Sequence, residues 1–86
     1  MKPTREEFLN LKNAHPGTVL IFEDEGRYLF LGFDAVLAGQ TLLRRTTKVH
    51  LTDRMVRALY IPASDLSAAV GEIKQRHFKI KVEVIE

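Results

Sequence analysis

The chain has 86 residues, of which 45% are apolar and 28% charged, with 5 Gly, 3 Pro and no Cys. This composition indicates one folded domain over residues 1–86, and the lack of Cys excludes disulfides, thiolate metal sites and a cysteine nucleophile. The net charge of +2 is too small to indicate a nucleic-acid partner by itself.

No membrane segment or leader peptide is predicted. The longest apolar runs, such as Val19–Phe22 and Tyr28–Leu31, have four residues each, whereas a membrane-spanning helix needs about 20. The first seven residues become polar and acidic where a signal peptide would be apolar. We therefore expect a cytoplasmic protein without a membrane partner, and the start at Met1 favours a whole protein over an excised fragment.

The first helix is predicted from Thr4 onward. Residues Thr4–Glu7 fit a capping box, in which the Thr hydroxyl and the Glu carboxylate each bind a backbone N–H that the helix leaves free. Phe8, Leu11 and Ala14 then recur at intervals of three. The run His15–Gly17, with Pro at its centre, is predicted to end the helix.

A β-hairpin is predicted next. The unbroken apolar run within Thr18–Glu23 is typical of a central strand that is buried on both faces. Glu23–Gly26 predicts a turn, because Gly26 supplies the positive φ that closes a tight hairpin. Arg27–Phe33 is then the returning strand.

A second helix is predicted over Ala35–Leu42, with Asp34 as its N-cap. Val36, Leu37 and Leu42 are expected to face inward. Residues 43–53 remain open, because Thr and Val favour a strand while the polar residues favour a loop.

The last third of the chain predicts a strand, a helix and another strand. Met55–Ile61 is a strand ended by Pro62, and Ser64 or Asp65 caps the following helix. The expected inward face of that helix carries Leu66, Ala69, Val70, Ile73 and His77. Phe78, Ile80, Val82 and Val84 alternate with charged residues, the pattern of a half-exposed strand that would suit a sheet edge. The predicted fold is α+β, a mixed sheet of about four to five strands flanked by about three helices.

Positive charge is concentrated in one stretch. Residues 1–43 have a net charge of −2, whereas residues 44–57 carry Arg44, Arg45, Lys48, Arg54 and Arg57 against a single acid and reach +4. Such a stretch could contact phosphates, which would make binding strongly salt-dependent. The alternative is a solvated loop and edge strand that Arg and Lys keep soluble.

No catalytic constellation is visible in the sequence. The histidines 15, 50 and 77 are scattered, and none has the i, i+4 spacing of a helical metal pair. His77 is expected to cap helix carbonyls. The acids Glu23–Glu25 are expected to be solvated at the hairpin tip rather than to bind a metal. We therefore predict a protein that is not an enzyme and has no cofactor.

The order of these segments has a counterpart in a known family. Phe8–Pro16 contains Lys-x-x-His-Pro and runs into the apolar strand Val19–Phe22. The similarity continues through the Gly26 hairpin into Asp34-Ala35, and Tyr60–Pro62 is similar to a Gly-Ile/Val-Pro-Tyr-His motif. Together these segments resemble the N-terminal mismatch-recognition domain of the MutS DNA mismatch-repair family over nearly all 86 residues. The resemblance implies the fold of that domain.

In the MutS family, a Phe-x-Glu motif after the hairpin glycine contacts the mismatch. The Phe stacks on a mispaired base from the minor groove, and the Glu hydrogen-bonds that base. If Gly26 is matched to the family glycine, Tyr28 takes the Phe position and Phe30 the Glu position. If the match is carried back from the following helix, Arg27 and Leu29 take these positions. The Glu is absent in both alignments.

The acidic hairpin tip also departs from the family pattern. Glu23–Glu25 would place three negative charges beside the phosphates of a DNA groove, which is unfavourable even with strong screening. The family has an Arg-Met-type pair in this region. The chain is also too short to contain the clamp and ATPase domains of a complete MutS protein. The resemblance therefore implies a DNA-associated accessory module that is not an ordinary mismatch sensor.

Two functions remain open at this point. In the first, the five basic residues of the stretch 44–57 contact the backbone of double-stranded DNA, with Arg27 and Tyr28 as groove contacts. The alternative for Tyr28 is ordinary packing on a sheet face. In the second, the domain is a protein-interaction or self-associating module, in which the acidic tip and the strand Phe78–Ile85 contact a partner or a second copy.

Overall fold

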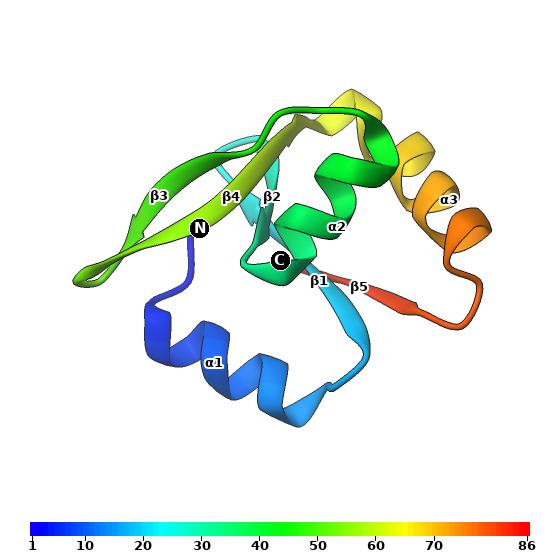
Figure 1. The fold of residues 1–86 in the computed structure, drawn as a ribbon. Coiled ribbons are helices and arrows are strands. Elements are labelled where there is room, and N and C mark those ends of the chain that lie inside the picture. Colours follow the sequence, from blue (N-terminus) through cyan, green and yellow to red (C-terminus); the bar gives the residue numbers. More distant parts are fainter.

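The centre of the molecule is a mixed sheet of five strands in the order β3-β4-β2-β1-β5 (Figure 1). The computed structural model describes all 86 residues. Its elements are α1 (Arg5–Ala14), β1 (Thr18–Asp24), β2 (Arg27–Leu31), α2 (Phe33–Leu42), β3 (Thr47–Leu51), β4 (Arg54–Pro62), α3 (Leu66–Arg76) and β5 (Lys81–Ile85). Paired strands are antiparallel except β1 and β5, which are parallel. The predicted α+β class, with its mixed sheet and three helices, is confirmed.

The helices cover both faces of the sheet and create two apolar layers. Along β1, Val19 and Ile21 pack in the cluster that includes residues of α2 and α3, whereas Leu20 and Phe22 pack in the cluster that includes Phe8 of α1. All four β1 side chains are buried. The prediction that β1 is a central strand buried on both faces is therefore confirmed.

Helix α1 begins and ends as the sequence predicts. The backbone N–H of Glu7 donates to the Thr4 hydroxyl at 3.1 Å, and the Thr4 N–H donates to the Glu7 carboxylate at 2.8 Å. This capping box lowers the pKa of Glu7, chiefly through the backbone hydrogen bond from Thr4. After the helix, Gly17 turns the chain into β1 with a φ of 78°.

The start of α2 differs from the prediction. The helix begins at Phe33 with Gly32 as its N-cap, so Asp34 is not the cap. The buried Asp34 carboxylate instead accepts hydrogen bonds from Lys12 Nζ at 3.0 and 3.1 Å and from the Leu20 N–H at 3.1 Å. Strand β2 ends at Leu31, earlier than predicted, and the β1–β2 pairing stops at Ile21. The Leu20 N–H lies past that point, and the carboxylate supplies its acceptor.

The inward face of α2 is made of small residues. Ala35, Ala38 and Gly39 are buried, while Leu37 and Leu42 are half-buried against the same core as predicted. Val36 was expected to face inward, but 37% of its surface is exposed. The packing is too close for a large side chain at the end of the helix, since a Cβ on Gly39 would lie 2.9 Å from Thr46 Cγ2.

Residues 43–53, which the sequence left open between strand and loop, form a loop followed by the edge strand β3. A two-residue turn at Thr52 and Asp53 joins β3 to β4, because Leu51 pairs with Arg54. Thr52 adopts a φ of 60°, and its hydroxyl accepts a hydrogen bond from the Arg5 N–H at 3.2 Å. The turn is thereby tied to the first residue of α1.

The C-terminal elements follow the prediction with two corrections. Asp65 is the N-cap residue of α3, as one alternative proposed, but its side chain makes no capping bond. Phe78 lies outside β5 and is 81% exposed, because a turn closed by the Ile80 N–H and the His77 carbonyl precedes the strand. Strand β5 is at the sheet edge, as expected. None of the helices has the length and apolar character to cross a membrane.

Candidate nucleic-acid interface

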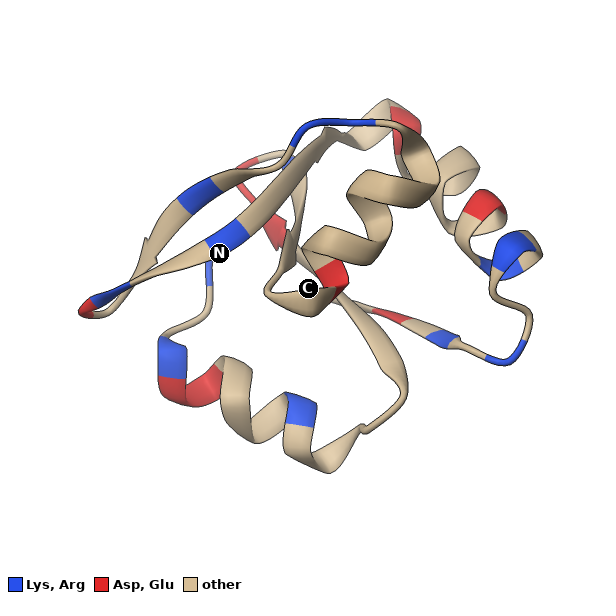
Figure 2. Cartoon of the chain, viewed as in Figure 1, with Lys and Arg blue, Asp and Glu red and all other residues tan.

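The positive stretch of the sequence forms a projecting β-ribbon and the loop that leads into it. In Figure 1 the β3–β4 hairpin extends past α1 and α2, and Figure 2 shows Lys and Arg distributed along the hairpin and the loop after α2. Within the hairpin, Lys48 pairs with Arg57 and Leu51 pairs with Arg54. We call this set the basic ribbon; it consists of Arg44, Arg45, Lys48, Arg54 and Arg57, which are all exposed.

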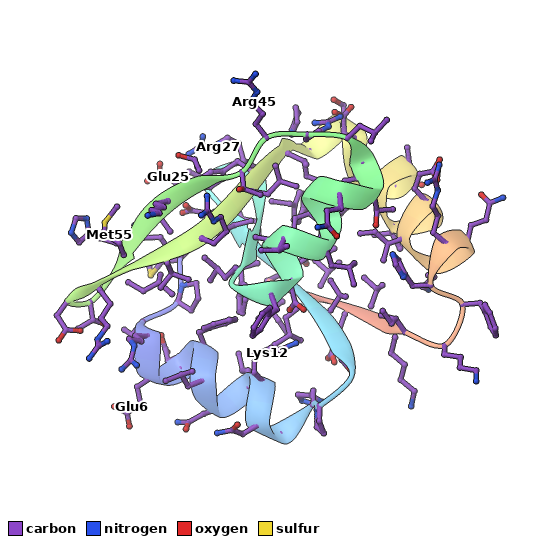
Figure 3. All side chains as sticks on the ribbon, in the orientation of Figure 1. Glu6, Lys12, Glu25, Arg27, Arg45 and Met55 are labelled. Carbon is purple, nitrogen blue, oxygen red and sulfur yellow. The ribbon has the colours of Figure 1, made fainter.

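Most of the basic ribbon has no internal counter-charge. Arg44 forms an ion pair with Asp65 at 2.8 Å, and Arg57 donates to the Thr46 hydroxyl at 3.3 Å. The other three side chains, Arg45, Lys48 and Arg54, have no hydrogen-bond or ion-pair partner. Arg45 extends from the loop away from the rest of the molecule (Figure 3).

The basic ribbon presents charge on two faces. Side chains alternate along a strand, and Val49 and Val56 pack against the core layer beneath α1. Lys48 and Arg57 therefore point to the α2 side of the sheet. Arg54 lies two residues from Val56 and points, like Val56, to the α1 side. Arg54 and Arg57 are separated by about 10 Å along β4.

Arg27 and Tyr28 lie apart from the basic ribbon. Arg27 pairs with Pro62 at the other end of β4, about 17 Å from Arg57 along the strand. Its guanidinium lies over the ring of Tyr60, 3.9 Å from the ring centroid. Tyr28 is half-buried and packs against the core beneath α2 and α3, as its alternative interpretation expects.

The positions that correspond to the family Glu are closed to solvent in both alignments. Leu29 and Phe30 are fully buried, in the two opposite core layers. Neither side chain can reach a base while this core is intact. The hairpin therefore lacks a base-contacting pair of the Phe-x-Glu kind.

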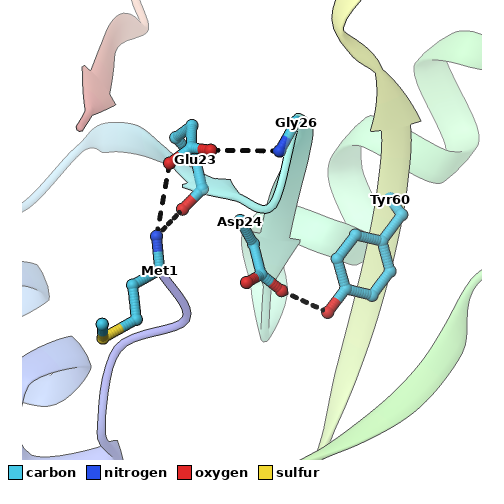
Figure 4. Close-up of polar contacts among 5 residues, drawn as sticks. All are labelled: Met1, Glu23, Asp24, Gly26 and Tyr60. Atoms are coloured by element: carbon cyan, nitrogen blue, oxygen red, sulfur yellow. Dashed lines mark hydrogen bonds and ion pairs between the residues drawn. The ribbon is translucent and has the colours of Figure 1, made fainter.

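The acidic tip was expected to be solvated, but two of its three acids have partners within the fold (Figure 4). Glu23 pairs with the Met1 ammonium at 3.3 Å and accepts the Gly26 N–H at 3.1 Å. The Gly26 hydrogen bond is the largest cause of the lowered pKa of Glu23, and the Met1 ammonium adds to it. Asp24 accepts a hydrogen bond from the Tyr60 hydroxyl at 2.9 Å.

Tyr60 joins the two hairpins at this end of the sheet. Burial is the largest cause of its raised pKa, and the hydrogen bond and charge of Asp24 raise it further. Arg27, which lies over the ring, lowers the pKa of Tyr60. This cluster connects β1, β2 and β4 and leaves only Glu25 of the acidic tip without a partner.

The histidines do not gather into a site. His77 was expected to cap helix carbonyls, and as the C-cap residue of α3 it donates its backbone N–H to the Ile73 carbonyl. Its ring Nε2 forms a 3.0 Å hydrogen bond with the Thr41 hydroxyl of α2. His15 lies 4.0 Å from Glu83. No group of three or more His, Asp or Glu side chains is placed to hold a metal ion.

One exposed feature was missed at the level of sequence. Phe33, Val36 and Leu43 lie on the outward side of α2 and its C-cap, with Phe33 90% and Leu43 88% exposed. Because seven of the eleven residues 33–43 are apolar, the segment gives no clear indication of which side is buried. The spacing of 33, 36, 40 and 43 is the signal that could have identified this face.

A scan against models of known protein families gives no match, and no curated protein matches the chain.

Proposed function

We propose that this domain associates with the phosphate backbone of double-stranded DNA through the basic ribbon, as a non-catalytic accessory module related to the N-terminal domain of MutS. The order of helices and strands is compatible with the resemblance, and the buried Leu29 and Phe30 support the part of the proposal that excludes mismatch reading.

The observation that carries the proposal is the pairing of Lys48 with Arg57. Two like charges directly opposite each other in an antiparallel pair destabilise the sheet. No carboxylate of the chain lies between them to relieve the repulsion. An external anion would remove this repulsion on binding, and a row of phosphates is the anion that a line of cations fits best.

The remaining cations extend the positive surface in both directions, with Arg54 on the α1 side of the hairpin and therefore on the face opposite to Lys48 and Arg57. Arg45 extends from the loop that precedes β3, and Arg54 lies at the opposite end, near the turn. Phosphate contacts of this kind fix the position of a protein on DNA without selecting a sequence. The proposed complex is therefore salt-dependent and does not select a base sequence or a mismatch.

The test is a titration of a fluorescent 20-base-pair duplex, on the order of two helical turns, at several salt concentrations. If all five cations contact phosphates, the slope of log K against log salt should be about −4.5. Replacing both Lys48→Gln and Arg57→Gln should weaken binding and reduce the slope by about 1.8. A duplex with a G·T mismatch should bind as tightly as the matched duplex.

The matched control is Lys79→Gln with Lys81→Gln, which removes the same charge from the start of β5 and the turn before it. Both lysines are exposed and lie at the opposite edge of the sheet. This control should retain nearly all of the affinity. Salt-independent binding, no binding at tens of micromolar, or an equal loss in the two double variants would refute the proposal.

A further inference from the structure

The outward side of α2 is apolar, although nothing in the chain covers it. Its exposed positions are Phe33, Val36 and Gln40, followed by Leu43 at the C-cap. The opposite side of the same helix is already packed on the sheet through Ala35 and Ala38. A surface helix usually has polar residues on the side that faces water. Here the two largest side chains of this row are about nine-tenths exposed, 90% for Phe33 and 88% for Leu43.

Leu43 is held in this exposed place by a strained backbone. It is the C-cap of α2, with φ 56° and ψ 48° in the left-handed region, and its N–H donates to the Gly39 carbonyl. Glycine is the usual residue at such a helix end, because a Cβ is unfavourable in this conformation. Leu43 therefore adds backbone strain and exposed apolar surface, and neither is compensated by a contact within the chain.

The apolar row borders a hollow with a positive rim. The hollow has a volume of about 330 Å³ and lies between α2 and the ribbon; its lining is Val36, Gly39, Gln40, Arg44, Thr46 and Arg57. Two arginines line this space, Arg44 and Arg57, and no Asp or Glu is among its lining residues. Of the two arginines, only Arg44 has an ion-pair partner, which is Asp65. The charge of the rim is therefore positive and only partly neutralised.

From this combination we infer that α2 and the adjoining hollow form a docking site for an acidic amphipathic segment of another protein. Apolar side chains of the partner cover Phe33, Val36 and Leu43, and an Asp or Glu enters the hollow beside Arg57. The apolar positions of the row are i, i+3 and i+10, with Gln40 at i+7, so they form a stripe along α2 that the apolar stripe of an amphipathic partner helix can cover. The partner is assigned as a protein rather than as DNA because the row presents large apolar side chains and no cation.

This site is separate from the proposed DNA contact except at its border. Lys48, Arg54 and Arg45 belong to the basic ribbon alone, whereas the apolar row belongs to α2 alone. Arg44 and Arg57 contribute to both surfaces. Because the apolar row is not part of the DNA contact, the docking proposal does not depend on whether DNA binds. A bound partner would nevertheless compete with DNA for Arg44 and Arg57.

The test places a photo-crosslinker in the centre of the row. The full chain carries p-benzoylphenylalanine at Gln40, and the control carries it at Gln75 on the exposed side of α3. After irradiation in the source cells, mass spectrometry identifies the crosslinked segment and not only the captured protein. We expect a product specific to Gln40, in which the attached segment has two or more large apolar residues at helical spacing and an excess of Asp and Glu.

Every other product would overturn the inference. No product above the Gln75 control would mean that the row is not a docking site. Attachment to nucleic acid would assign α2 to the DNA surface, and attachment to a second copy would assign it to self-association. A neutral or basic segment would contradict the role of Arg44 and Arg57.

A substitution at Leu43 separates docking from folding. Leu43→Gly relieves the left-handed strain and removes the apolar side chain, so the melting temperature should stay unchanged or rise. The yield of the Gln40 product should nevertheless fall, by about tenfold if one buried leucine contact is lost. An unchanged yield with a folded protein would exclude Leu43 from the site and, with it, the proposed row.

Discussion

The acidic and the basic parts of this chain use their charges differently. In residues 1–43, four of the six acids bind groups of the fold: Glu7 caps α1, Glu23 binds the Met1 ammonium, Asp24 binds Tyr60 and Asp34 binds Lys12. In the basic ribbon, one of five cations forms an ion pair, and that is Arg44 with Asp65. The acids act within the structure, whereas most of the basic charge is left for contacts outside it.

Net charge alone is therefore a poor guide to a binding surface. The sequence places three acids at one hairpin tip and five cations around the other hairpin. From the sequence alone, both groups are expected to be exposed to solvent. The structure gives Glu23 and Asp24 local partners, so their carboxylate oxygens are engaged within the fold. Substitutions in the two groups should therefore have opposite consequences for stability and for binding.

The largest effect is expected at the buried acid. Asp34→Ala should lower the free energy of unfolding by about 3 kcal/mol, because the Leu20 N–H would lose its acceptor and the Lys12 ammonium would lose its counter-charge and keep only the Thr18 carbonyl. Urea denaturation measures the change. Glu6→Ala, which removes an exposed acid of α1 that has no bonding partner, should stay within about 0.5 kcal/mol.

A double-variant cycle tests the cause of that loss. Lys12→Met removes the ammonium that Asp34 neutralises, so the double variant Lys12→Met with Asp34→Ala should lose less stability than the sum of the single changes. Strict additivity would show that the two side chains do not act as a pair. A loss below about 1 kcal/mol for Asp34→Ala would place this acid with the exposed charges.

The second substitution, Lys48→Glu, should stabilise the fold but weaken DNA binding. Lys48→Glu places a carboxylate opposite Arg57 and should raise the free energy of unfolding by about 0.5 kcal/mol. The same change should weaken the proposed duplex binding by about tenfold or more at low salt. Lys81→Glu makes the same charge change on β5 opposite Thr18 and should leave duplex binding nearly unchanged. A parallel fall in stability and binding for Lys48→Glu would contradict the interpretation.

The sequence predicted the fold well where local chemistry decides it. The capping box of α1, the buried strand β1 and the Gly26 turn depend on neighbouring residues, and each was found at or within one residue of its expected place. The errors concern contacts between segments that are distant in the sequence. Asp34 has the appearance of an N-cap until β2 ends early and leaves the Leu20 N–H without a partner.

The candidate surfaces were predictable only in part, for a related reason. The basic ribbon can be identified from composition, but the register that opposes Lys48 to Arg57 depends on the two-residue turn at Thr52. The apolar row on α2 has the same residue types as the inward side of the helix, so only its spacing distinguishes it from the core. In the structure, Ala35 and Ala38 lie against the sheet, whereas Phe33 stays outside.

A smaller effect is expected in the titration of Tyr60. Its raised pKa results first from burial and then from Asp24, and Arg27 opposes these two causes. Asp24→Asn should move the pKa part of the way back towards 10.0, and Arg27→Gln should move it further up. Tyrosinate absorbance measures both, with Tyr60→Phe as the blank. The folded state disfavours the phenolate form of Tyr60. The free energy of unfolding should therefore fall as the pH rises from about 10 through the folded pKa of Tyr60.

The smallest effect is expected at the exposed end of the acidic tip. The pKa of Glu23 is lowered from 4.5 by the Gly26 hydrogen bond and the Met1 ammonium. Its contribution to stability is therefore present above pH 4.5 and is lost as the pH falls through the lower folded value. Glu23→Gln should flatten the acid side of the stability–pH curve, whereas Glu25→Gln, at a carboxylate without a partner, should not change it. Equal curves for the two variants would mean that the partners of Glu23 do not stabilise its carboxylate, so that Glu23 resembles the unpaired cations of the basic ribbon. The two hairpins would then differ only in the sign of their charge.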